Sequence, residues 1–172
     1  MRQINNSQEM TSLAKIISGG QAGTDRAALD WAIARGMPHG GWCPEGRLAE
    51  DGVIPLHYKL EELPGAGYRQ RTRQNVLDSD CTLILNIGEL DGGTLQTARF
   101  AQQHNKPCCV VQLDSCEFTQ QAVRDWMLGC GVLNVAGPRE SRRPGIYRLS
   151  YDFLDRWLEW QADSAMRGNN EF

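Results

Sequence analysis

The sequence predicts an α/β domain whose doubly wound, mostly parallel sheet carries helices on both faces. Short apolar segments alternate with longer segments of helical periodicity along most of the chain. The apolar segments are continuous, as is typical of strands that are covered on both faces. Glycine-rich stretches follow several of them, and sheets of this kind bind ligands beyond the carboxyl ends of their strands. The pattern therefore predicts both the fold and the edge at which a site would lie.

Strands are predicted where a short apolar run leads into glycine or another turn residue. They are Lys15–Ser18, Thr82–Ile87, Pro107–Leu113 and Val132–Ala136, with a shorter one at Gly40–Cys43. Helices are predicted between them at Thr24–Arg35, Arg69–Ser79, Thr94–His104, Thr119–Leu128 and Tyr147–Gln161. In the last helix an apolar stripe is expected to pack on the sheet: Leu149, Phe153, Leu154, Trp157 and Leu158. One long stretch, Cys43–Gly67, is predicted to be irregular, and a loop of that length in a compact domain is functional or closes over a site.

The 172 residues are enough for one domain, which we expect at residues 14–163 between a polar leader (1–13) and a polar tail (164–172). A net charge of −3 argues against a general nucleic-acid-binding surface. No apolar run is long enough to cross a membrane, and the first residues lack the apolar core of a signal peptide. We therefore expect a cytoplasmic protein that binds neither nucleic acid nor membranes.

The cysteines give no sign of a metal site. Six are present, and none forms a C-x-x-C pair. Without an export signal they are expected to be reduced thiols, and those in apolar runs are expected to act as small apolar side chains.

The first glycine-rich loop lies between a predicted strand and a predicted helix. Glycine allows close approach of a ligand to the backbone, and the N–H groups of a helix's first turn favour an anion. An alternative is that Thr24 or Asp25 caps the helix. Asp25 would repel a bare phosphate but suits a ribose hydroxyl or a metal, and Arg26 either neutralises an anion or is solvated. The candidate ligand-binding residues of this loop are Gly19, Gly20, Gln21, Gly23, Thr24, Asp25 and Arg26.

A second unit of the same design follows the strand that ends near Asn86. Gly92, Gly93 and Thr94 offer N–H donors and a hydroxyl where the next helix starts. The alternative is a tight turn with a threonine cap. Because a glycine-rich loop follows two of the predicted strands, the sequence favours a phosphate-bearing ligand. Asn86, at the end of the second of these strands, is included in the predicted site.

Arginines supply two further parts of the predicted site. The segment 135–145 follows a strand and includes Arg139, Ser141 and Arg142, which would clamp a diphosphate or form a solvated basic loop. Arg71 stands with other arginines near the start of a helix, where cations oppose the helix dipole unless an anion is close. No nucleophile, base and orienting group occur together. The sequence therefore displays a binding site more clearly than a catalytic one.

These motifs together resemble a known family. The stretches concerned are Ser18–Ala28, Gly41–Gly52, Arg71-Thr72 with Asn75-Val76, Asp91–Thr94 and Asn134–Ser141, within about residues 14–160. They are similar to the molybdenum carrier family, a circularly permuted branch of the SLOG (lysine decarboxylase-like) superfamily, which includes the LOG phosphoribohydrolases. The resemblance implies a Rossmann-like fold, a homo-oligomer, and binding of molybdenum cofactor or a nucleotide-like ligand.

The LOG signature is only half present. It reads Pro-Gly-Gly-x-Gly-Thr-x-x-Glu, and its glutamate is catalytic. In this chain Asp91 precedes the two glycines, Leu95 and Gln96 replace the later glycine and threonine, and Arg99 stands in place of the glutamate. The phosphate-binding half of the motif is retained and the catalytic half is not.

Three functions are consistent with the sequence. The first is a carrier of molybdenum cofactor that delivers it to molybdoenzymes, with the Cys43–Gly67 segment shielding the cargo. The second is a nucleoside-monophosphate phosphoribohydrolase, for which Asp25, Glu45 and Asp91 are the available carboxylates. The third is a sensor that changes its oligomeric state on binding a nucleotide signal.

Overall fold

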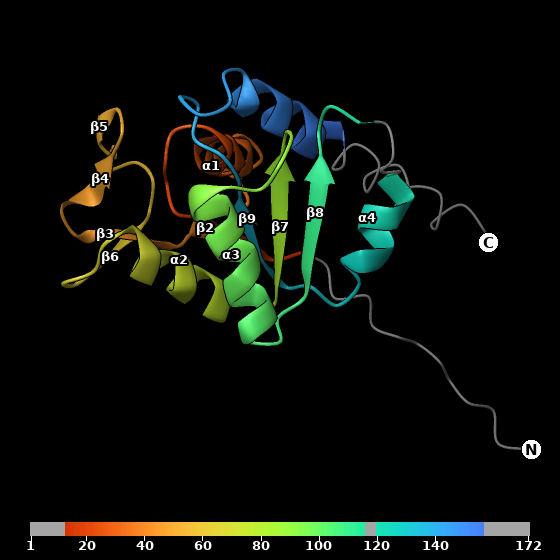
Figure 1. The fold of residues 1–172 in the computed structure, drawn as a ribbon, viewed down its shortest axis with the longest axis horizontal. Coiled ribbons are helices and arrows are strands. Elements are labelled where there is room, and N and C mark those ends of the chain that lie inside the picture. Colours follow the sequence, from red (N-terminus) through yellow and green to blue (C-terminus); the bar gives the residue numbers. More distant parts are fainter. Residues whose placement is uncertain (1–12, 116–119, 157–172) are drawn as a thin grey trace, which may run out of the picture.

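A parallel five-stranded sheet forms the centre of the protein (Figure 1). The computed structural model describes residues 13–115 and 120–156. The order of the strands in the sheet is β2-β1-β9-β7-β8. Their bounds are Lys15–Ile17 (β1), His39–Gly40 (β2), Cys81–Asn86 (β7), Cys108–Gln112 (β8) and Val132–Ala136 (β9). The predicted α/β fold with a mostly parallel sheet is confirmed.

The strand β9 occupies the middle of this sheet although it follows β7 and β8 in the chain. Leu133 pairs with Ile16 of β1 on one side and with Cys81 of β7 on the other. After β1 the chain moves outward to β2, and after β7 it moves outward in the opposite direction to β8. This divergence places the topological switch of the sheet over β9, where such sheets bind their ligands.

Helices cover both faces of the sheet. Their bounds are Thr24–Ala34 (α1), Tyr68–Leu77 (α2), Gly92–Gln103 (α3) and Gln120–Trp126 (α4), and a further helix spans residues 146–156. Trp31 of α1 and Val123 of α4 belong to the core cluster that includes Leu83 and Leu133 of the sheet. On the opposite face Val76 of α2 packs with Phe100 of α3. The helices on the two faces of the sheet thus belong to different hydrophobic clusters.

Only part of the apolar stripe predicted for the last helix packs on the sheet. Leu154 is fully buried, and Phe153 packs against the same core. Leu149 is 40% exposed, so its predicted packing on the sheet is wrong. Trp157 and Leu158 lie outside the described residues, as do the predicted tail and all but the last residue of the predicted leader.

The segment Cys43–Gly67 is not one irregular loop, as the sequence predicted. It contains a 3₁₀ turn (Glu45–Arg47), and its residues form most of two small sheets. The strands of these sheets are Trp42–Pro44 (β3) with Glu61–Leu63 (β6), and Leu48–Ala49 (β4) with Gly52–Val53 (β5). The buried Arg47 organises the segment, because its guanidinium donates to four backbone carbonyls: those of Ile54, Pro55, Tyr58 and Leu60.

The single strand predicted at Gly40–Cys43 is divided between two sheets. Gly41 has φ +124°, a backbone conformation that residues other than glycine rarely adopt. A Cβ on Gly41 would also lie 2.2 Å from the carbonyl oxygen of Ser18. The chain therefore leaves β2 at Gly41 and begins β3 in a different sheet.

Two of the six cysteines are joined by a disulfide, which corrects the expectation that all are reduced. Cys81 begins β7, and Cys130 lies just before the neighbouring strand β9. The parallel pairing of these strands brings the two Cα atoms to 6.2 Å, within the range that a disulfide spans. Cys43, Cys108 and Cys109 are free thiols.

No helix among the described residues is long and apolar enough to span a membrane.

We expect reduction of the Cys81–Cys130 bond to lower the free energy of unfolding by about 2–4 kcal/mol, because the bond closes a loop between residues 49 apart. Urea unfolding of the oxidised and reduced protein measures this difference. Cys108→Ser, which removes a free thiol, should leave the effect of the reductant unchanged. Absence of the cross-linked peptide from a non-reduced digest would refute the assignment.

Candidate functional site

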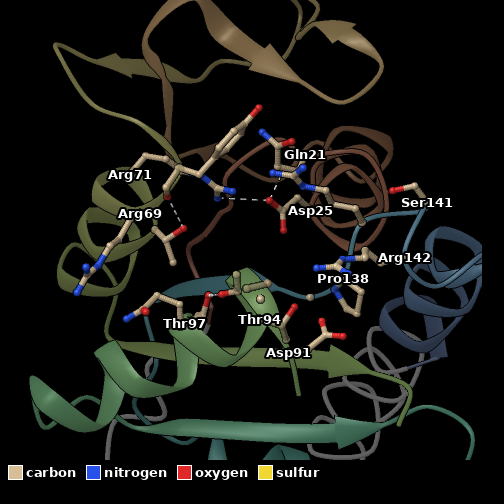
Figure 2. A pocket seen from close by; sticks show the side chains of 18 residues that line it. Gln21, Asp25, Arg69, Arg71, Asp91, Thr94, Thr97, Pro138, Ser141 and Arg142 are labelled. Carbon is tan, nitrogen blue, oxygen red and sulfur yellow. Dashed lines mark hydrogen bonds and ion pairs between the residues drawn. The ribbon is translucent and has the colours of Figure 1, made fainter. Parts of the chain in front are cut away.

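A cavity of about 420 Å³ lies at the carboxyl edge of β1, β9 and β7 (Figure 2). This volume is typical of small-molecule sites. The side chains and backbone that line it come from both glycine-rich loops, from α2 and from the segment that follows β9. They are Gln21, Asp25, Tyr68, Arg69, Arg71, Thr72, Asp91, Gly92, Gly93, Thr94, Gln96, Thr97, Ala136, Gly137, Pro138, Arg139, Ser141 and Arg142.

The start of α3 presents backbone donors to the cavity. The helix begins at Gly92, and its N-cap, Asp91, makes no side-chain capping hydrogen bond. The carboxylate of Asp91 instead lies 3.3 Å from the guanidinium of Arg143. Thr94 lies inside the first turn, so the alternative of a threonine cap is wrong. An uncapped first turn that lines a cavity is a general binding site for anions.

Arg71 and Asp25 face each other on the opposite side of the cavity (Figure 2). Arg71 Nη1 lies 3.6 Å from Asp25 Oδ2, and the two side chains are 12% and 6% exposed. The Arg71 Nε–H has no acceptor among the described residues, although the atom is buried. A buried guanidinium with an unused donor is costly unless a ligand supplies an acceptor.

Gly19 makes room for this arginine. A Cβ on Gly19 would lie 1.6 Å from Arg71 Nη1 and 2.5 Å from its Cζ. The glycine was predicted to let the backbone approach a ligand, but in the structure it lets the Arg71 guanidinium approach the backbone.

Burial dominates the electrostatics of this pair. It raises the pKa of Asp25, and the nearby charge of Arg71 and a hydrogen bond from the Gln21 N–H oppose the rise. Asp25 Oδ2 accepts that hydrogen bond at 3.3 Å. The site therefore contains a carboxyl group whose protonation is easier than in water, next to a cation.

Backbone N–H groups at the start of α1 donate hydrogen bonds to carbonyls of other segments. The Thr24 N–H donates to the Pro138 carbonyl and the Arg26 N–H to the Gln21 carbonyl. Neither Thr24 nor Asp25 caps the helix, because the N-cap is Gly23 and no side chain bonds there. The first loop thus brings the side chains of Gln21 and Asp25 to the cavity, instead of the free N–H groups that the sequence predicted.

Gln21 is the second residue of the cavity with an unused polar atom. Its side-chain amide donates to the Leu48 carbonyl at 2.9 Å. Its Oε1 is buried and has no donor among the described residues. The cavity therefore offers an unused acceptor as well as unused donors.

The loop after β9 closes one side of the cavity. Arg139 lies over the Tyr68 ring, with 4.6 Å between Cζ and the ring centroid. Arg142 Nη2 lies 3.5 Å from the position that a Cβ on Gly92 would take, so this guanidinium adjoins the start of α3. Ser141 donates its N–H and its hydroxyl to Glu50.

The structure brings together nine of the predicted site residues: Gln21, Asp25, Arg71, Gly92, Gly93, Thr94, Arg139, Ser141 and Arg142. The others do not line the cavity: Gly19, Gly20, Gly23, Thr24, Arg26 and Asn86. Arg26 forms an ion pair with Asp51, Thr24 shares a hydrogen bond with Ser150, and Asn86 donates to the Gly88 carbonyl.

Nine of the eighteen lining residues were not among the predicted site residues, and one predicted carboxylate loses support. Tyr68 and Thr97 lie on α2 and α3, one and three residues from positions that the sequence had singled out. Glu45 is not a lining residue and accepts the Gly65 N–H. Arg99, at the position of the LOG glutamate, is exposed and does not line the cavity.

Gly19→Ala should displace the Arg71 side chain and weaken binding of inorganic phosphate about tenfold, the effect of losing one charge-assisted hydrogen bond. Isothermal titration measures the affinity, and thermal unfolding shows whether the fold is retained. Gly67→Ala is the matched control, since a Cβ there meets only Gln70 Oε1 at 3.6 Å. Unchanged binding by Gly19→Ala together with a loss in Arg71→Ala would refute the role of Gly19.

Lowering the pH from 7 to 5 should strengthen binding of sulfate, which keeps its charge in this range. The raised pKa of Asp25 means that this carboxyl takes up a proton as the pH falls, and the guanidinium of Arg71 keeps its charge although burial lowers its pKa. Asp25→Asn should bind sulfate about tenfold more tightly at pH 7 and depend less on pH. Equal pH dependence in both proteins would contradict this prediction.

The chain is similar to a known protein family and to a solved structure. The model of the circularly permutated YpsA SLOG family matches residues 16–158. A crystal structure of a protein named "Putative molybdenum carrier protein" from Syntrophus aciditrophicus SB is 45% identical. The match covers 86% of this chain and 96% of that one, with a TM-score of 0.79. Among the curated proteins, no sequence matches this chain. The chain belongs to the circularly permutated YpsA branch of the SLOG family.

Proposed function

We propose that the protein binds and carries a small phosphate-bearing molecule in this cavity, and that the molecule is molybdenum cofactor. The observation that carries the proposal is the buried Arg71, whose Nε–H has no acceptor among the described residues. An unpaired donor of this kind is retained where a ligand completes its hydrogen bonds. The name of the 45% identical structure supports molybdenum cofactor as the cargo.

The residues of the cavity suit the parts of that cofactor. It is a pterin with a terminal phosphate and an oxyanion-like metal centre. The first turn of α3 would hold the phosphate, and Arg71 and Arg142 would neutralise anionic oxygens. The unused Gln21 Oε1 would accept a hydrogen bond from an N–H of the pterin. Molybdoenzymes would be the receivers of the cargo.

Carriage is favoured over hydrolysis by the state of the carboxylates. Asp25 lies next to Arg71, and Asp91 next to Arg143. A general base has to be within hydrogen-bond reach of the proton that it takes up from the substrate. With both lining carboxylates engaged by arginines, the site is better suited to holding a charged ligand than to cleaving one.

The small sheets of the segment 43–67 would shield the cargo. Gln21, which lines the cavity, donates to Leu48 of β4, so the segment is bonded directly to the site. A cover of this kind protects a labile ligand without a covalent bond to it.

Native mass spectrometry tests the proposal, with molybdenum cofactor, AMP and ADP-ribose as separate ligands. We expect one cofactor per chain, and no adduct with Gly93→Leu. A Cβ on Gly93 meets no atom within 4 Å, so the leucine side chain would enter open space at the start of α3 without disturbing the fold. Gly67→Ala is again the control.

Other outcomes distinguish the competing functions. Nucleotide adducts without a cofactor adduct would refute carriage of the cofactor, and release of adenine from AMP would establish hydrolysis. A change in oligomeric mass on nucleotide binding, measured by light scattering, would establish a sensor.

A further inference from the structure

Three residues of the hairpin β4–β5 bond to other segments, and two of them bond to residues that line the cavity. The Leu48 carbonyl accepts the Gln21 side-chain amide. Asp51 forms a bidentate ion pair with Arg26, with N···O distances of 2.9 and 3.1 Å. Glu50, between them in the chain, binds Ser141. The hairpin therefore bonds to the first loop and to the loop after β9 at once.

The contact between Glu50 and Ser141 has the form of anion recognition. One carboxylate oxygen of Glu50 accepts the Ser141 N–H at 3.3 Å, and the other accepts the Ser141 hydroxyl. A backbone N–H and a hydroxyl that converge on two oxygens of one anion form the arrangement by which proteins also bind phosphate. Glu50 is exposed, so its carboxylate would return to water at little cost if another anion replaced it.

The next residue connects this contact with the rest of the cavity. Ser141 and Arg142 both line the cavity, and the Arg142 guanidinium adjoins Gly92 at the start of α3. Arg142 forms no ion pair with any residue in the ranges 13–115 and 120–156. One cation thus lies between two sets of anion-binding donors, the first turn of α3 and Ser141.

We propose that Ser141 and Arg142 form a second oxyanion subsite, which takes the second anionic group of a diphosphate-like ligand, and that Glu50 occupies this subsite until that group displaces it. The proposal rests on the proposed function, because it assumes that the first anionic group binds at Arg71 and α3. It adds that the ligand carries two anionic groups and that the hairpin loses one of its three ties when the ligand binds.

Isothermal titration of the full chain with inorganic phosphate and with pyrophosphate tests the subsite. Glu50→Gln removes the competing charge and should bind pyrophosphate about fivefold more tightly than the wild type, while phosphate affinity changes less than about twofold. Asp51→Asn is the matched control, since it removes the same charge one residue away and breaks another tie of the hairpin. Its affinity for both probes should stay within about twofold of the wild type.

The remaining outcomes would refute either the second subsite alone or the anion-binding function as well. If the wild type binds pyrophosphate and Glu50→Gln binds it no more tightly, the second subsite is refuted and the proposed function stands. Equal gains in Glu50→Gln and Asp51→Asn would show that loosening the hairpin or adding positive charge suffices, which also refutes the subsite. If neither probe binds to the wild type or to Glu50→Gln, the anion-binding function fails, and the subsite fails with it.

Discussion

The pairing of β9 with both β1 and β7 is the constraint on which the rest of the structure depends. Parallel strands send their carboxyl ends to one edge of the sheet, so this pairing brings three loops together there. The loop after β9 then covers the start of α1, through the bond from Thr24 to Pro138, and leaves the start of α3 open to the cavity. The same pairing brings Cys81 close to Cys130.

Charge within the cavity is arranged around cations that are held in place by carboxylates. Asp25 lies beside Arg71, and Asp91 beside Arg143. Each carboxylate offsets part of the cost of holding a guanidinium near the cavity, and neither uses all of its arginine's donors. The cavity is lined by four arginines and two aspartates, so it keeps an excess of positive charge and of donors, which suits binding of an anion.

Local sequence signals predicted the features that depend on neighbours in the chain, and failed where distant segments meet. The strands β1, β7, β8 and β9 and the loop at Gly92 and Gly93 were predicted because apolar runs and glycines are local signals. The role of Gly19 was missed because it depends on Arg71, which lies on another helix. The disulfide and the covering of the start of α1 both require the central place of β9 in the sheet. No spacing along the chain specifies that place.

The central place of β9 has a consequence for the order of events during synthesis. β1 and β7 each pair with β9 and not with each other, and β9 is the last strand of the sheet to leave the ribosome. A nascent chain that ends before β9 therefore has two separate strand pairs, β1–β2 and β7–β8, with unpaired inner edges. Residues 137–142, which complete the cavity, emerge later still. The cavity is therefore complete only when these residues have been translated, and a chain that ends before them lacks one side of the cavity.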